Sequence, residues 1–143
     1  MSQIFNNLWI TCGGTAREFD FLRENEITHI LNCAEEEPMN YPKDMTIIHI
    51  PMTDDEDDNA MSQIIQGAQI LAVWMNADAN TIVHCKAGIS RSVTVVLAWM
   101  IIYKEYTFNN AYKFVQGKRN FINPNDYYRK LLKIIEETFH TGA

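Results

Sequence analysis

One short segment carries the residue types that nucleophilic chemistry requires. Cys85 and Arg91 have five residues between them in the run Val83-His84-Cys85-Lys86-Ala87-Gly88-Ile89-Ser90-Arg91-Ser92. An apolar strand is expected to end just before the cysteine and a helix to begin at the arginine, so that backbone N–H groups and a helix N-terminus face one point. Gly88 tolerates the positive φ that a tight turn requires. The segment therefore predicts a small cup for an oxyanion, with Arg91 binding two of its oxygens.

The same surroundings favour the ionised form of the Cys85 thiol. A helix N-terminus, backbone amides and a guanidinium stabilise a thiolate, and a pKa that falls from ~8.5 to ~5.5 corresponds to about 4 kcal/mol. Cys85 would then be a nucleophile at neutral pH, and the cup would stabilise charge on a transferring phosphoryl group. The alternative interpretation is a core cysteine followed by a surface arginine, which requires this pattern to arise by chance.

The composition of the remaining chain is that of one globular domain. The 143 residues are 47% hydrophobic and 21% charged, with a net charge of −6. This acidic balance disfavours a nucleic-acid partner. No apolar run approaches the ~20 residues of a membrane span, and no signal-peptide pattern is visible. Three widely spaced cysteines indicate free thiols in a reducing compartment, so we expect a location in the cytoplasm, with the nucleus as a second location.

Short apolar strands alternate with helices along the chain. The patterns predict strands at 8–10, 27–33, 46–50 and 81–83, with Gly13-Gly14 ending the first. Helices are predicted at 18–25, 61–75, 91–103 and 107–118, the third apolar on nearly all sides. Pro124 is expected to open a last helix, whose inner face is Tyr128, Leu131, Leu132, Ile135 and Phe139. This order predicts an α/β sandwich around a mostly parallel sheet.

The run from His84 to Ser92 closely resembles the signature loop of the small, or atypical, dual-specificity protein phosphatases of the cysteine-dependent protein tyrosine phosphatase superfamily. Leu8-Trp9-Ile10, residues 27–32, Ile50-Pro51-Met52-Thr53-Asp54 and Pro124-Asn125 extend the likeness over nearly the whole chain. The resemblance implies a three-layer sandwich, with a central sheet of about five strands flanked by helices and the cup at the carboxyl ends of the strands. It also implies one catalytic domain over residues 1–143.

The resemblance implies roles for individual residues. Cys85 would become a phosphocysteine, Arg91 would bind phosphate and steady the transition state, and Ser92 would help the sulfur leave. An ordinary first-turn helix serine is the alternative for Ser92. The phosphate-binding residues would be Lys86, Ala87, Gly88, Ile89, Ser90 and Arg91. This chemistry needs no metal and no cofactor, and the sequence contains no metal-ligand motif.

The leaving alkoxide or phenoxide needs a proton, and the acidic run 54–58 offers donors. Alignment with the family places the acid at Asp54, 31 residues before the cysteine, with Asp55 as the runner-up. The other carboxylates of the run are expected to be solvated.

Three further features carry weaker expectations. His84 is expected to hold the loop through hydrogen bonds. Residues 35–37, Glu35-Glu36-Glu37, are expected to form a solvated turn, with substrate choice by repulsion of acidic partners as the alternative. Cys33 is expected to be a buried strand cysteine, with a regulatory disulfide to Cys85 as the alternative.

The function implied by the resemblance is metal-independent hydrolysis of phosphate monoesters on phosphotyrosine and on phosphoserine or phosphothreonine of proteins. The partners would be phosphorylated proteins, and we expect a monomer. An alternative keeps the chemistry on a phosphoinositide, a phospho-glucan or an RNA 5′-phosphate. Lys86 favours this alternative, whereas Ile89, where a second lysine would hold a polyphosphate, disfavours it. A catalytically inactive phosphate-binding module and a sulfurtransferase are further alternatives; the retained Cys85 and Arg91 disfavour the first, and Ser92 the second.

Overall fold

Five strands form one sheet, in the order β1-β2-β5-β3-β4, in the computed structural model, which describes residues 1–140. The strands are β1 (Ser2–Phe5), β2 (Leu8–Thr11), β3 (His29–Asn32), β4 (Thr46–His49) and β5 (Thr81–His84). The four strands β2 to β5 run parallel, and β1 pairs antiparallel with β2. This confirms the predicted mostly parallel sheet. The hydrophobic pattern does not mark β1, because its apolar residues are the adjacent pair Ile4 and Phe5, which shows no alternation.

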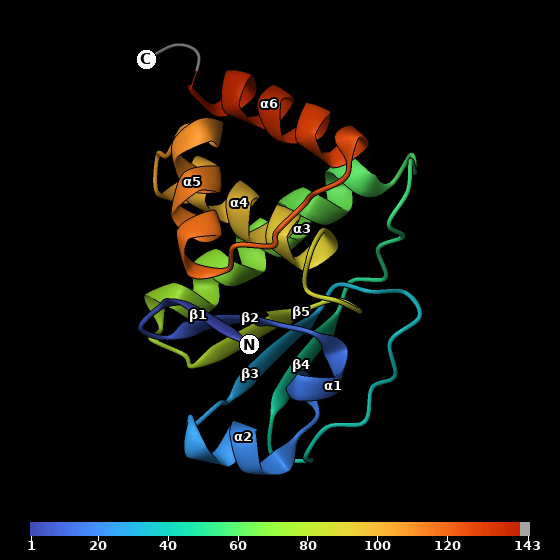
Figure 1. Cartoon of the computed structure of the whole chain (residues 1–143), viewed down its shortest axis with the longest axis vertical. Coiled ribbons are helices and arrows are strands. Elements are labelled where there is room, and N and C mark those ends of the chain that lie inside the picture. The colour runs from blue at the N-terminus through green and yellow to red at the C-terminus, as the bar shows by residue number, and fades with distance from the viewer. Residues whose placement is uncertain (141–143) are drawn as a thin grey trace.

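Helices cover both faces of the sheet (Figure 1). One face carries α1 (Gly13–Ala16) and α2 (Phe19–Glu24), and the other carries α3 (Ala60–Asn76), α4 (Arg91–Tyr103), α5 (Phe108–Lys118) and α6 (Asp126–His140). The three-layer sandwich implied by the resemblance is therefore confirmed. Among residues 1–140, no helix has the length and the apolar character that crossing a membrane requires.

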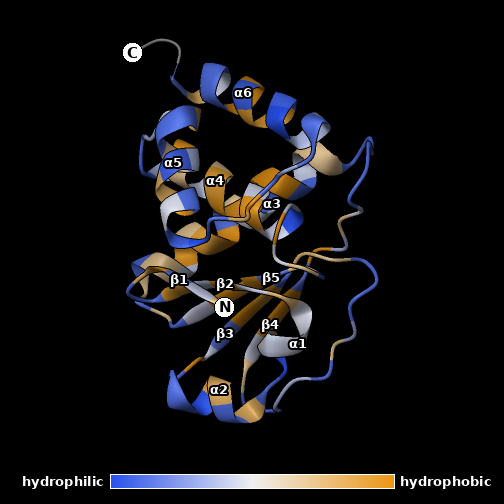
Figure 2. Ribbon diagram, in the orientation of Figure 1, coloured by the Kyte–Doolittle hydropathy of each residue, from blue (hydrophilic) through white to orange (hydrophobic). Residues whose placement is uncertain are grey.

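Alternate residues of the central strands face two separate cores. Ile30 and Ile82 contribute to the smaller core beneath α2, whereas Leu31 and Val83 contribute to the larger core beneath α3 to α6. Helix α4 lies in the middle of the larger core and is buried from Arg91 to Ile101, and Figure 2 shows its predominantly apolar surface. Because β5 is also buried at all four of its residues, the loop between β5 and α4 has a fixed element at each end.

Two predictions about the last helix are wrong. Helix α6 begins at Asp126 and not at Pro124, because the side chain of Asn125 caps it by accepting a hydrogen bond from the Tyr128 N–H (2.8 Å). Phe139 is 46% exposed, whereas the other four residues of the predicted inner face are buried. In this last turn the ring of His140 lies 2.9 Å from the Ile101 carbonyl, so His140 faces α4 in place of Phe139.

The first predicted strand ends before the glycine pair, as expected, because β2 stops at Thr11. The short helix α1, which Gly13 and Gly14 open, was not predicted. Elsewhere the predicted helices are confirmed within a few residues, and the Thr107 side chain caps α5 by accepting from the Asn110 N–H (3.1 Å).

Helices α3 and α4 are in close contact at Gly67. A Cβ atom added there would lie 2.7 Å from Cγ1 and 3.2 Å from Cγ2 of Val95, which is fully buried. We expect Gly67→Ala to lower the free energy of unfolding by about 1–3 kcal/mol, because a packed core has no room for the methyl group. Urea denaturation measures this change.

Gly117→Ala in α5 is the matched control. No heavy atom lies within 4 Å of the Cβ that this substitution adds. It should raise the free energy of unfolding by roughly 0.5–1 kcal/mol, since alanine loses less conformational freedom in a helix. Equal stability of Gly67→Ala and the wild type would contradict the packing described here.

Candidate active site

Cys85 follows the last residue of the central strand β5, at the carboxyl ends of the parallel strands. Its sulfur lies 3.3 Å from Ser92 Oγ and accepts a hydrogen bond from the Gly88 N–H (3.3 Å). Although Cys85 is only 2% exposed, it lines a cavity of about 410 Å³ together with Asp54, Arg91 and other residues of the loop. The thiol therefore lies at the floor of a cavity, where an oxyanion can reach it.

The carbonyl groups of the loop are bound on the side opposite the thiol. The four consecutive carbonyls of residues 86–89 each accept a hydrogen bond. The Gly13 N–H donates to Lys86 O (3.0 Å), and the Asn123 N–H donates to Ile89 O (2.9 Å). Arg119 binds the two carbonyls between them, with Nη2 donating to Ala87 O (3.3 Å) and Nε to Gly88 O (2.8 Å). Because the N–H and C=O of a trans peptide point in opposite directions, this turns the N–H groups of residues 87–90 toward the sulfur. The Gly88 N–H, which meets Cys85 Sγ, shows that orientation directly.

Position 88 requires glycine. Its φ is +70°, and an added Cβ would lie 2.6 Å from Arg119 Nη2 and 2.7 Å from the Thr11 carbonyl oxygen. Both the backbone conformation and the close approach of β2 therefore exclude a side chain here. Gly88, which is identified in the sequence because glycine tolerates a positive φ, is thus required for the backbone conformation of this loop.

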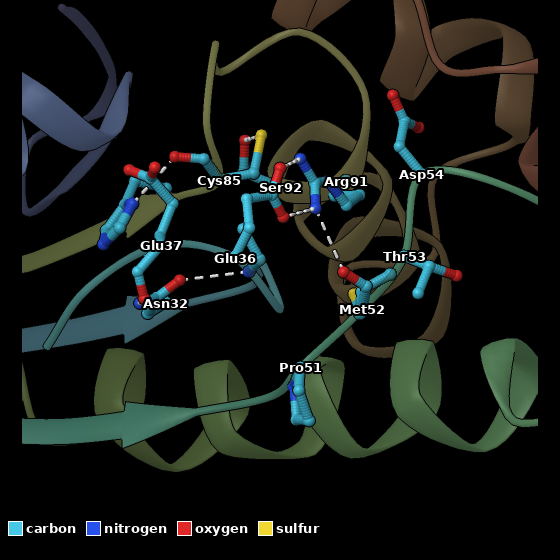
Figure 3. A network of polar contacts seen from close by, with 12 residues as sticks. Asn32, Glu36, Glu37, Pro51, Met52, Thr53, Asp54, Cys85, Arg91 and Ser92 are labelled. Carbon is cyan, nitrogen blue, oxygen red and sulfur yellow. Dashed lines mark hydrogen bonds and ion pairs between the residues drawn. The ribbon is translucent and has the colours of Figure 1, made fainter.

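The guanidinium of Arg91 is held by hydrogen bonds to Glu36 and to the Met52 carbonyl, as Figure 3 shows. Nη1 donates to Glu36 Oε1 (2.6 Å) and to the Met52 carbonyl (3.0 Å), and Nη2 donates to Glu36 Oε2 (2.8 Å). Nε is buried and has no hydrogen-bond partner within residues 1–140. Since Nη2 keeps a second hydrogen, Nε and Nη2 together offer two parallel donors, the arrangement that binds two oxygens of a phosphate.

The predicted turn at 35–37 is present, and the Glu36 side chain is 48% exposed, but two of its glutamates form ion pairs that were not predicted. Glu36 is the ion-pair partner of Arg91, whose hydrogen bonds lower the pKa of Glu36 to about 2. Glu37 pairs with Arg17 (3.1 Å). Glu35 is exposed, as predicted. The sequence does place this turn directly after a strand, hence at the same sheet edge as Cys85, but charge repetition alone does not identify which glutamate pairs with which arginine.

The structure distinguishes the two candidate acids. Asp54 lines the cavity with Cys85 and Arg91, and its Oδ1 accepts from Asn125 Nδ2 (3.0 Å). Figure 3 shows Asp54 next to Arg91, on the side away from Cys85. Asp55 is not among the lining residues, and its side chain accepts from the Glu56 N–H (2.8 Å) in a local turn. Of the two candidates, Asp54 is therefore the one that lines the cavity containing the thiol.

His84 is buried beside the loop in its neutral form. Its Nδ1 lies 2.9 Å from the carbonyl oxygen of Cys85, which can only accept, so Nδ1 carries the hydrogen and Nε2 accepts from the hydroxyl of Tyr41. Burial lowers the pKa of His84 from 6.5 to about 4 and raises the pKa of Tyr41 to about 12. His84 therefore holds the start of the loop through two hydrogen bonds, as the sequence predicts.

All three cysteines lie at the same edge of the sheet. Thr11 and Asn32 both pair with His84, so Cys12, Cys85 and Cys33 are the next residues on three adjacent strands. All three are free thiols, and the Cys33–Cys85 disulfide stays a prediction. Cys33 is fully buried, as predicted, and burial raises its pKa well above the usual range. Within residues 1–140, no group of three or more His, Cys, Asp or Glu side chains is arranged to hold a metal ion.

Several contributors lie far along the chain from the predicted segment. Arg119 and Asn123 bind the loop carbonyls, and the Asn125 N–H donates to Ser90 Oγ (3.1 Å). Their connection between α5 and α6 has only the likeness of Pro124-Asn125 to mark it in the sequence. They act through tertiary contacts, which leave no local pattern.

Comparison with known proteins finds a phosphatase family model and phosphatase relatives that are similar to this chain. The family model described as "Dual specificity phosphatase, catalytic domain" matches residues 8–137. The Slingshot homolog, a protein phosphatase of Xenopus laevis, is 27% identical over 132 residues, which cover 92% of this chain and 19% of that protein. Dual specificity protein phosphatase 22 of Xenopus tropicalis is 31% identical over 134 residues, covering 93% of this chain and 63% of that protein. This chain thus spans about a fifth of the first relative.

Solved structures share the fold. Human DUSP28 matches the whole of this chain over its own whole length, with a TM-score of 0.90 and 19% identity. PTPMT1, solved in complex with PI(5)P, matches with a TM-score of 0.77 and 16% identity, covering 96% of this chain and 95% of that one.

The neutral state of His84 makes stability depend on pH. The unfolded chain binds a proton at this residue near pH 6.5, whereas the folded chain binds it only near pH 4, so acid favours unfolding. We expect the free energy of unfolding to fall by about 2 kcal/mol between pH 7 and pH 5. Urea titrations at both values measure this. His84→Gln should be less stable at pH 7 but should lose most of the pH dependence; a wild type equally stable at both values would contradict the assignment.

Proposed function

The chain belongs to the dual specificity phosphatase catalytic domain family, and on that premise we propose that residues 1–143 form the catalytic domain of a cysteine-dependent dual-specificity protein phosphatase. Its substrates are phosphotyrosine and phosphoserine or phosphothreonine in proteins. One observation carries this proposal: a thiol and an unpartnered hydrogen-bond donor line the same cavity. Cys85 lies at the cavity floor, and the buried Nε–H of Arg91 has no partner among residues 1–140.

The first chemical step transfers the phosphoryl group to sulfur. The thiolate of Cys85 forms the S–P bond while the P–O bond to the leaving oxygen breaks, and Asp54 gives its proton to that oxygen. The N–H groups of residues 87–90 and the Nε and Nη2 of Arg91 donate to the three transferring oxygens. Because these donors are already oriented, little reorganisation accompanies the reaction.

The second step hydrolyses the phosphocysteine. Asp54, now ionised, takes a proton from a water molecule as the water oxygen attacks phosphorus and the S–P bond breaks. The Ser92 hydroxyl, 3.3 Å from the sulfur, donates a hydrogen bond to the departing thiolate. Inorganic phosphate leaves, and Cys85 returns to its ionised form.

A phosphoinositide substrate is the second candidate. The fold is shared with PTPMT1, whose structure contains PI(5)P, and the exposed Lys86 adds positive charge to the loop. However, the side chain of Ile89 offers no charge to a further phosphate, and Glu36 and Asp54 lie beside Arg91. A head group with several phosphates would meet these carboxylates, so a single phosphorylated side chain fits better.

Turnover in EDTA tests the function. We expect the purified chain to hydrolyse phosphotyrosine and phosphothreonine peptides, and Cys85→Ser to lose activity by roughly 10³-fold or more, because the nucleophile is removed. Failure of the wild type to hydrolyse any aryl phosphate would refute the proposal. A roughly thousandfold preference for inositol phosphates, about 4 kcal/mol in transition-state binding, would move the substrate to the lipid class.

Two matched substitutions test the acid. Asp54→Asn should lower kcat on a phosphoserine peptide by roughly 10²–10⁴-fold, because the alkoxide then leaves without a proton. The loss should be much smaller on 4-nitrophenyl phosphate, whose leaving group is stable as an anion. Asp55→Asn should behave like the wild type on both substrates. The reverse pattern would assign the role to Asp55.

A further inference from the structure

Arg119 is a buried cation without a carboxylate partner. It is 4% exposed, and the ion pairs found within residues 1–140 join Arg17 to Glu37 and Arg91 to Glu36. Arginine is rarely buried unless it is paired, since removing its charge from water is costly. An unpaired, buried guanidinium therefore needs another explanation.

The hydrogen bonds of Arg119 all go to neutral oxygens. Nε donates to the Gly88 carbonyl (2.8 Å), Nη2 to the Ala87 carbonyl (3.3 Å) and Nη1 to Ser2 Oγ (2.9 Å). The ring of Phe121 lies against the guanidinium, with 4.4 Å between its centroid and Cζ. Two of the three bonds thus reach consecutive carbonyls of the loop that surrounds Cys85.

These two bonds act at the most deformable point of the loop. Gly88 has no Cβ and already adopts a positive φ, so rotation of its flanking peptides meets little steric resistance. A rotated peptide would turn a carbonyl oxygen toward the bound phosphate and withdraw an N–H donor from it. The planar fork of an arginine can bind both carbonyls at once and so hold both peptides.

Arg119 also differs from Arg91 in whether a nearby carboxylate compensates its positive charge. Glu36 neutralises Arg91 through two hydrogen bonds, whereas no carboxylate within residues 1–140 pairs with Arg119. Burial lowers the pKa of Arg119, and the neighbouring thiols of Cys12 and Cys85 oppose this change. An ionised Cys85 thus has an uncompensated cation on the far side of its loop.

We propose that Arg119 is a positioning residue for this reaction, which holds the 87–88 and 88–89 peptides with their N–H groups toward the phosphate and places an uncompensated positive charge behind the loop. The inference rests on the proposed function, because it concerns the same phosphate site. It predicts that oxyanion affinity and turnover depend on a residue that never touches the substrate.

Three variants test this inference. Arg119→Met removes the fork and the charge, and Arg119→Lys keeps the charge but cannot bind all three oxygens. Arg23→Met is the control, an exposed arginine of α2 on the opposite face of the sheet from α4. Tungstate binding by calorimetry and kcat on a phosphotyrosine peptide are the measurements. We expect Arg119→Met to weaken tungstate binding and lower kcat by roughly 10- to 100-fold, somewhat less than loss of a direct oxyanion donor. Arg119→Lys should recover part of both, and Arg23→Met should bind tungstate like the wild type.

Each outcome decides the question. A folded Arg119→Met protein with wild-type tungstate affinity and kcat would overturn the inference, as would a variant that loses only thermal stability while its folded fraction binds normally. If Arg119→Met does not fold, the lysine variant decides, and wild-type affinity in it would overturn the inference. An inactive wild type would refute the proposed function, but tungstate binding would still test Arg119.

Discussion

A buried strand and a buried helix fix the two ends of the loop that contains Cys85. All of β5 and the greater part of α4 are inaccessible to water, so neither end of the loop can move without disturbing the core. Between these ends the loop carbonyls of residues 86–89 are each bound to a donor from another segment of the chain. The amide donors are therefore oriented before any ligand arrives, and the free energy of folding provides that order.

Of the two guanidinium groups near the thiol, one forms an ion pair and the other does not. The chain carries a net charge of −6, yet two buried guanidiniums lie at its catalytic loop. Glu36 fixes the orientation of Arg91 and leaves its Nε face open, whereas Arg119 keeps its charge uncompensated. Local arrangement, and not total charge, therefore determines what the cavity attracts.

The sequence is sufficient for the parts of the site that lie close together in the chain. The anion-binding turn between Cys85 and Arg91 and the buried helix after it could be predicted, because turn chemistry and hydrophobic period are local. Within the acidic run, only the resemblance to the family favoured Asp54 over Asp55. Glu36 and Arg119 could not be predicted, because what distinguishes them is a partner far away in the sequence. The wrong predictions at Pro124 and Phe139 also come from contacts that the local pattern does not encode. The Asn125 side chain caps α6, so the helix begins after Pro124, and His140 contacts α4 where Phe139 was expected to pack.

The hydrogen bond between Arg119 and Ser2 spans 117 positions of the chain. The same guanidinium donates to the carbonyls of Ala87 and Gly88, and the N–H groups of Asn123 and Asn125 donate to the next two residues of that loop. Contacts between such distant segments form late, since loop closure must precede them. On the ribosome, the phosphate cup therefore cannot be completed until residue 125 has emerged. A chain that ends before Arg119 would contain Cys85 but not the donors that bind the carbonyls of residues 87–89.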